Sequence, residues 1–183
     1  MKSFLLTGIL ILMTLRLDSA FQDRPTDRAK PAAMGQEVAV QTVDPINEAG
    51  LRKLMRERNG KILFLNIWAT WCVPCVAEFP DLVKVSQAYD AKKVEVVGIS
   101  VDFPDEVNSK IIPFLKKQKV PFKNYVADFK DPQDFINAVN RTWSGGVPAT
   151  FIYDSGGKER FSLIGKGTFE QFKKEIDKVR GLK

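Results

Sequence analysis

The chain has 183 residues, two cysteines, no histidine and a formal net charge of +6 at pH 7. A chain of this length fits one domain or at most two. Without histidine, neither a Ser-His-Asp triad nor a Cys-His pair can form within the chain. Two thiolates without imidazole also do not complete the usual tetrahedral Cys/His zinc site, unless two chains share one.

The first twenty residues have the layout of a secretory signal peptide. Lys2 precedes a mostly apolar run over residues 4–15, and the segment ends at Ser19-Ala20. The run is shorter than the ~20 residues that a membrane-spanning helix needs. We therefore expect an extracytoplasmic protein in the bacterial periplasm. The alternative is an uncleaved signal that anchors the protein in the membrane, because Asp18 stands where cleavage prefers a small residue.

Residues 21–36 are polar, carry prolines and show no hydrophobic period, which is typical of a flexible linker. The domain is therefore expected over residues 37–183. Without Lys2, Arg16 and Asp18, 26 basic and 21 acidic side chains remain, interspersed along the chain. This pattern favours a solvated surface of mixed charge over a basic patch, so we expect no nucleic-acid partner.

The segment "EVAVQTV" (residues 37–43) alternates like a strand and ends at Asp44-Pro45. We interpret Asp44-Pro45 as an N-cap followed by proline at the first helical position, with the helix ending at Asn59-Gly60. "KILFLNIWA" (61–69) and "VEVVGISVD" (94–102) are apolar runs typical of strands buried on both faces. Between them, apolar residues recur at helical spacing: Val76, Phe79, Leu82, Val83, Val85 and Tyr89.

A helical stretch broken by Pro113 follows, then a strand-like "FKNYVA" (122–127) and a helix near residues 131–140. "ATFIY" and "ERFSLIG" flank "DSGGK", which predicts a hairpin. Thr168 and Gln171 stand in capping-box register before the last helix. This order predicts an α/β fold of three layers, with a mixed central sheet flanked by helices and an extra helix–strand insertion after the third strand.

Cys72 and Cys75 are separated by Val73-Pro74 and fall between the first apolar strand and the helix after it. Open α/β sheets place their chemistry at such strand ends. A disulfide across so short a loop stabilises a fold little, which favours a reactive pair over a structural one. Val76 after Cys75 excludes a c-type haem attachment sequence.

The helix start favours the thiolate of the first cysteine through its free N–H groups and dipole. We expect Cys72 to be exposed there and Cys75, one turn on, to be more buried. Cys72 would then attack a partner disulfide, and Cys75 would resolve the mixed disulfide. Pro74 is tolerated because no intrahelical bond is lost in the first turn.

"FLNIWATWCVPCVAEFPDL" (residues 64–82) resembles the active-site segment of thioredoxin-like proteins. Its pattern W-C-x-P-C-x-x-E-x-P-x-L, together with "GISVD" and "GGVPATFIYDSGGK", resembles the TlpA/ResA/CcmG branch over residues 37–183. The resemblance implies a thioredoxin-like fold, no cofactor, no metal, and a cis Pro148 that faces the disulfide. Because Trp71 adjoins Cys72, we expect it to face the substrate; the alternative is a place at the rim of the core. We expect Val147 and Pro148 to present an edge to an extended substrate segment. Asn66 stands where ordinary thioredoxins carry a buried aspartate, as is usual for the branch.

Glu78 lies three residues beyond Cys75 on a similar side of the helix, in a position we expect to be half-buried. An ionised Glu78 would raise the thiol pKa values and could accept the proton of Cys75, which predicts a catalytic role and a reducing pair. The resemblance implies a substrate protein and an upstream membrane electron donor as partners. Relatives reduce apocytochrome c, copper-assembly proteins or other substrates.

Two other functions stay open. A peroxidase on the same fold would need Pro-x-x-x-Thr-x-x-Cys, whereas Thr70 stands two residues before Cys72 and residue 66 is asparagine. A Cu(I) carrier could hold the metal between the two soft thiolates, although neither histidine nor a nearby methionine supports it.

Overall fold

The computed structural model describes residues 42–181. The expected signal peptide (1–20), the expected linker (21–36) and most of the strand expected over 37–43 lie outside these residues. None of the helices described is long and apolar enough to cross a membrane.

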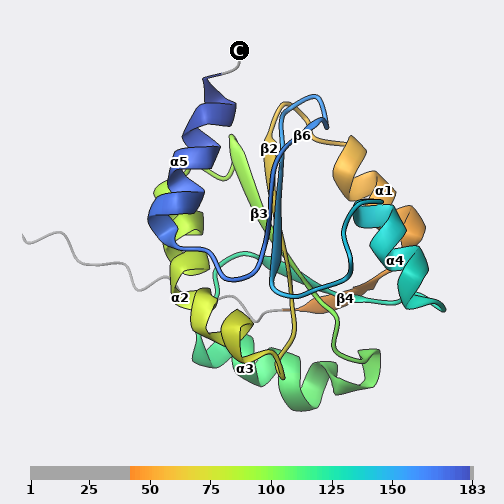
Figure 1. The fold of residues 1–183 in the computed structure, drawn as a ribbon. Helices are drawn as coiled ribbons and strands as arrows, with labels where there is room; N and C mark the ends of the chain where they lie inside the picture. Colours follow the sequence, from red (N-terminus) through yellow and green to blue (C-terminus); the bar gives the residue numbers. More distant parts are fainter. Residues whose placement is uncertain (1–41, 182–183) are drawn as a thin grey trace, which may run out of the picture. The chain divides into compact units, whose positions relative to one another are not determined.

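Within residues 42–181, six strands form one mixed sheet in the order β1-β4-β3-β2-β5-β6 (Figure 1). The first four strands in this order run parallel, whereas β5 pairs antiparallel with β2 and β6 pairs antiparallel with β5. The strands are β1 (Val43–Ile46), β2 (Ile62–Trp68), β3 (Val94–Ser100), β4 (Lys123–Ala127), β5 (Ala149–Tyr153) and β6 (Glu159–Ile164). The expected mixed sheet is confirmed, as is the insertion that supplies β4.

Helices cover both faces of the sheet (Figure 1). The helices are α1 (Glu48–Arg56), α2 (Val73–Ala88), α3 (Ile112–Lys117), α4 (Pro132–Val139) and α5 (Phe169–Arg180). Residues of α2, α3 and α5 share one buried apolar cluster with the sheet, and residues of α1 and α4 share the other. Every residue of the central strand β2 is buried, because both faces of the strand are covered. The three-layer, thioredoxin-like architecture is therefore confirmed.

The first helix begins later than the sequence indicates. Asp44 and Pro45 lie within β1, and α1 begins after Asn47, whose side chain accepts a hydrogen bond from Gly50 N at 2.9 Å. The predicted cap was wrong because pairing with β4 extends the chain there, and proline is tolerated in an edge strand. The helix also ends at Arg56, before the expected stop at Asn59-Gly60.

Pro113 does not break a helix. It lies at the start of α3, directly after a π-helical turn, and the chain stays helical through it. A 3-10 turn (Pro104–Glu106) and a π-helical turn (Val107–Ile111) lead into α3 without interruption. The β5–β6 hairpin is confirmed, because the two strands pair antiparallel. The cap of α5 is also confirmed, because Thr168 Oγ1 accepts a hydrogen bond from Gln171 N at 3.3 Å.

Candidate active site at the cysteine pair

The two cysteines form a disulfide where β2 gives way to α2. Cys72 is the N-cap of α2 and Cys75 lies in its first turn, with an S–S distance of 2.06 Å and a Cα–Cα distance of 5.2 Å. Cys75 N also points at Cys72 Sγ, 3.2 Å away. The pair thus stands at the expected strand end and helix start, where a thiolate on Cys72 would meet free backbone N–H groups.

Cys72 is more buried than the sequence indicates. Its exposed fraction is 5%, against 1% for Cys75, so the expected order holds but the expected exposure of Cys72 was wrong. The Cys72 side chain lies in the buried apolar cluster that also contains Cys75 and Trp68, which shields it from solvent. The neighbours Trp71 and Val73 are 64% and 78% exposed. Cys72 is therefore flanked in the chain by two exposed apolar side chains.

Glu78 is fully buried in α2, deeper than the half-buried position expected for it. Its Oε1 accepts a hydrogen bond from Asn66 Nδ2 at 2.8 Å, and its Oε2 accepts one from Gly167 N at 2.5 Å. These partners come from β2 and from the segment before α5, and they compensate the carboxyl for the water it loses. Burial raises the pKa of Glu78 from 4.5 to about 7, with the two hydrogen bonds and the charge of Lys166 opposing the rise.

A second polar contact extends this network across the sheet. Asn66 in β2 is paired in register with Thr150 in β5, and its Nδ2 also donates to Thr150 Oγ1 at 3.0 Å. Within residues 42–181, Asn66 Oδ1 is buried without a hydrogen-bond partner. Asn66 thus presents its amide N–H groups to Glu78 and Thr150, and its oxygen is a spare acceptor inside the protein.

Val147-Pro148 is a cis peptide bond, as the resemblance implied. Pro148 is buried, and its carbonyl oxygen accepts from Gly165 N at 2.7 Å. Val147 is partly buried and packs against the apolar cluster that contains both cysteines. This segment therefore lies against the same cluster as the disulfide, although Pro148 is 76 residues away from Cys72 in the chain.

Sequence reasoning missed two residues that hold the site together. Gly167 donates to Glu78, and a Cβ at this position would overlap the ring of Phe172. The sequence indicated Asp102 as the end of a strand and as part of "GISVD", with no role at the site, but its buried carboxylate accepts hydrogen bonds from Thr70, two residues before Cys72. The only local feature that singles out Gly167 is its position directly before Thr168, the cap of α5. No local pattern indicates the partner of Asp102.

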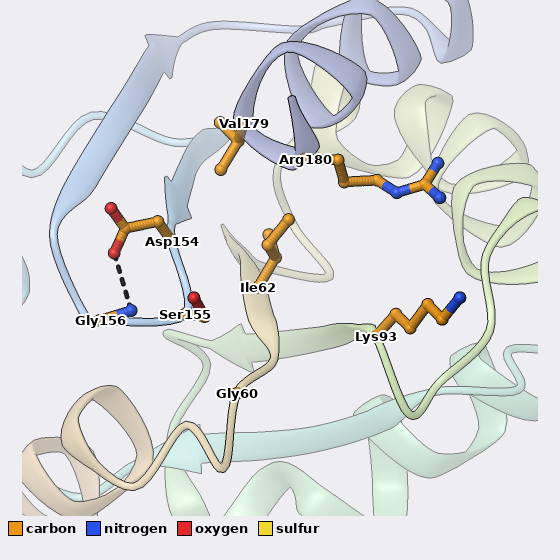
Figure 2. A pocket seen from close by; sticks show the side chains of 8 residues that line it. All are labelled: Gly60, Ile62, Lys93, Asp154, Ser155, Gly156, Val179 and Arg180. Atoms are coloured by element: carbon orange, nitrogen blue, oxygen red, sulfur yellow. Dashed lines mark hydrogen bonds between the residues drawn. The ribbon is translucent and has the colours of Figure 1, made fainter. Parts of the chain in front are cut away.

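Residues 42–181 contain no group of three or more His, Cys, Asp or Glu side chains arranged to hold a metal ion. A pocket of about 270 Å³ lies at the other end of β2, near Ile62, between the turn at Asp154–Gly156 and the end of α5 (Figure 2). It includes none of the candidate site residues.

The chain is similar to proteins that are named for thiol-disulfide exchange. The model of the AhpC/TSA family matches residues 35–161. The thiol:disulfide interchange protein HelX of Rhodobacter capsulatus is 29% identical over 160 residues, which cover 86% of this chain and 83% of HelX. The thiol-disulfide oxidoreductase ResA of Bacillus cereus is 29% identical over 126 residues, covering 68% of this chain and 67% of ResA.

Solved structures agree with the fold. A thiol:disulfide interchange protein of the thioredoxin family from Chlorobium tepidum has a TM-score of 0.57 and 25% identity, covering 67% of this chain and 82% of its own. A thioredoxin-related protein from Neisseria meningitidis has a TM-score of 0.58 at 24% identity, covering 67% and 87%, and shows the shared fold alone. The family match spans more than half of the sequence, and so the chain belongs to the AhpC/TSA family of thioredoxin-like proteins.

Proposed function

We propose that this thiol-disulfide oxidoreductase is a reductant of protein disulfides outside the cytoplasm, and that Cys72 and Cys75 carry the exchange. The Cys72 thiolate attacks a substrate disulfide, so that a mixed disulfide forms and one substrate thiolate leaves. Cys75 then attacks Cys72 Sγ, the Cys72–Cys75 bond closes, and the second substrate thiolate leaves. Two electrons pass to the substrate, and a dithiol protein must return two electrons to the pair by the reverse exchange.

The observation that supports this direction is the buried carboxyl of Glu78. It lies one helical turn beyond Cys75, and burial raises its pKa to about 7. A carboxylate with this pKa can take the Cys75 proton near neutral pH, which favours attack by the thiolate. When Glu78 is ionised, its negative charge also disfavours a thiolate on Cys72 or Cys75. The reduced form is then less stable, and the pair gives up its electrons more readily.

The residues between the cysteines agree with a reducing pair. Val73-Pro74 adds no positive charge that would stabilise a thiolate. We therefore expect a potential nearer the ~−270 mV of thioredoxin than the ~−120 mV of DsbA.

The substrate would approach over Trp71, Val147 and Pro148. Trp71 is exposed beside the disulfide, and Val147 packs against the cluster that contains both cysteines. Pro148 has no backbone N–H, so an extended segment passing it would bond to the neighbouring backbone groups. The substrates would be disulfides of cytochrome c precursors or of copper-site assembly proteins, with a membrane protein as the electron donor.

Export follows from the first twenty residues, which carry a charged start and an apolar run. Intact-mass analysis of the exported protein should show the loss of about residues 1–20. A full-length species extracted from the membrane would support an anchor instead.

The test is redox equilibration against glutathione, with thiol titration, on the wild type and on Glu78→Gln. We expect a reducing wild-type potential, and in Glu78→Gln lower thiol pKa values, a higher potential and slower reduction of a substrate disulfide. Glu57→Gln is the matched control, because Glu57 is exposed after α1. A wild-type potential close to that of DsbA, or a Glu78→Gln variant identical in pKa and rate, would contradict the proposal. Peroxide turnover and copper stoichiometry on the same samples test the peroxidase and the Cu(I) carrier.

A further inference from the structure

A buried carboxylate ties the loop between β2 and α2 to the end of β3. Asp102 is 3% exposed, and its oxygens accept two hydrogen bonds from Thr70: Oδ2 from the backbone N at 2.9 Å and Oδ1 from Oγ1 at 2.6 Å. Ser100 Oγ donates to Asp102 Oδ2 at 2.5 Å and accepts from Asp102 N at 3.0 Å. Ser100, at the end of β3, thus fixes the position of the Asp102 carboxylate, and the carboxylate in turn fixes Thr70 in the loop.

This anchor does not depend on the disulfide. Thr70 stands two residues before Cys72, and the loop turns between them, where Cys72 N donates to Ala69 O at 3.3 Å. None of the hydrogen bonds of Asp102 involves a cysteine, so all of them remain possible when the Cys72–Cys75 bond opens. In the reduced protein they restrain the loop on the side of Cys72 that lies away from α2, together with the bond from Cys72 N to Ala69 O.

We propose that Asp102 is a positioning residue for thiol-disulfide exchange, which keeps Cys72 within reach of Cys75 when the bond between them is open. The inference rests on the proposed function, in which this pair carries the exchange. During resolution, Cys75 must attack Cys72 Sγ while Cys72 is still bonded to the partner sulfur. The Cys72–partner bond breaks, the Cys72–Cys75 bond forms, and the partner leaves as a thiolate.

Loss of the anchor affects the two redox states unequally. In the oxidised protein the disulfide still restrains the loop, but in the reduced protein a loop without Asp102 gains conformations. The reduced state is then favoured, and the effective concentration of one thiol at the other falls. A tenfold lower effective concentration corresponds to a rise of about 30 mV in the potential of a two-electron pair. A purely structural role would lower the stability of both states equally and leave the potential unchanged.

The experiment equilibrates the exported protein with glutathione, as the wild type and as Asp102→Ala and Thr70→Val. We expect the effective concentration to fall about tenfold in Asp102→Ala. The fall should be smaller in Thr70→Val, because the backbone N–H of residue 70 still reaches Asp102. The mixed disulfide with a substrate peptide should live longer in the same order, and Thr70→Ser should restore the wild-type values because it keeps the hydroxyl.

Asp154→Ala is the matched control. Asp154 also holds a turn through its carboxylate, which accepts from Gly156 N at 2.9 Å (Figure 2). It also accepts from Lys158 N at 3.0 Å. This turn lies at the other end of the sheet, because Tyr153 pairs with Leu63 near the start of β2. Asp154→Ala should lower the melting temperature and leave the glutathione equilibrium unchanged.

Two results would overturn the inference. In the first, Asp102→Ala and Thr70→Val lower the melting temperature equally in both redox states, while the glutathione equilibrium and the mixed-disulfide lifetime stay at wild-type values. If Asp102→Ala does not fold, Thr70→Val decides by the same two readouts. In the second, the wild type itself fails to exchange with glutathione, which overturns the proposed function together with this inference.

Discussion

The buried carboxyl of Glu78 makes the stability of the oxidised protein depend on pH. Burial raises its pKa from 4.5 to about 7 in the folded state, whereas the unfolded chain leaves it in water near its ordinary value. The folded protein therefore holds the proton more tightly. The resulting stabilisation is complete below pH 4.5 and is lost as the pH rises through 7. The difference between the two pKa values corresponds to a loss of on the order of 3 kcal/mol.

Glu78→Gln removes this dependence while keeping the shape of the side chain. The new amide oxygen can accept from Gly167 N, as Glu78 Oε2 does now. The new NH₂ group would face Asn66 Nδ2, but Asn66 Oδ1 has no partner within residues 42–181. A half-turn of the Asn66 amide would let this oxygen accept from the new NH₂ and from the hydroxyl of Thr150. After this half-turn Asn66 Nδ2 takes the position that now has no partner, so we expect the variant to fold with the new amide paired and one Asn66 group unpaired, as in the wild type.

The assay is urea unfolding of the two oxidised proteins at pH 5 and pH 8. With the disulfide closed, the cysteines do not titrate, and all other ionisable groups are shared by the two proteins. From pH 5 to pH 8, Glu78→Gln should gain on the order of 3 kcal/mol in free energy of unfolding relative to the wild type. Glu57→Gln should follow the wild type. Parallel curves for the wild type and Glu78→Gln would refute the assignment of the raised pKa to Glu78.

Three further predictions concern single residues. Cys75→Ala should accumulate mixed disulfides with partner proteins on non-reducing gels, whereas Cys72→Ala should trap none; equal trapping would reverse the assigned order of attack. Trp71→Ala should raise KM for a protein disulfide and change the unfolding free energy by less than about 0.5 kcal/mol, since the side chain is largely exposed. Gly167→Ala should cost about 1–3 kcal/mol in urea unfolding, because its Cβ would overlap the Phe172 ring; a cost near zero would show that the ring can move aside.

The parts of the fold that the sequence predicted are those encoded locally. The uniformly apolar β2, the helical spacing in α2 and the cap at Thr168 each depend on residues a few positions apart. The prediction of a cap at Asp44-Pro45 was wrong because the local Asp-Pro signal was outweighed by strand pairing with a distant part of the chain. Pairing with β4 keeps these residues extended, and Asn47 caps the helix instead.

The site itself was predictable only along α2. The cysteine pair and the glutamate one turn on are visible in a single segment, but the depth of Glu78 depends on partners far away in the chain. Asn66 lies 12 residues from it and Gly167 lies 89 residues from it. The bond from Thr70 to Asp102 spans 32 residues. No local spacing encodes such contacts, since they arise only when neighbouring strands bring their ends together.

The proline in β1 matters for an enzyme that works on other polypeptides. Ile46 O accepts a hydrogen bond from Asp128 N, so the backbone groups of Pro45 point away from β4, toward the edge of the sheet that residues 42–181 form. Pro45 offers no N–H there, and the strand has only four residues, with a charged Asp44 beside the proline. A substrate that arrives partly unfolded carries unpaired strands that could add to an open edge and aggregate. The edge at β1 offers such strands few free backbone groups to pair with. Substrate strands are therefore less prone to bind at β1 than at the end of the sheet that carries the disulfide.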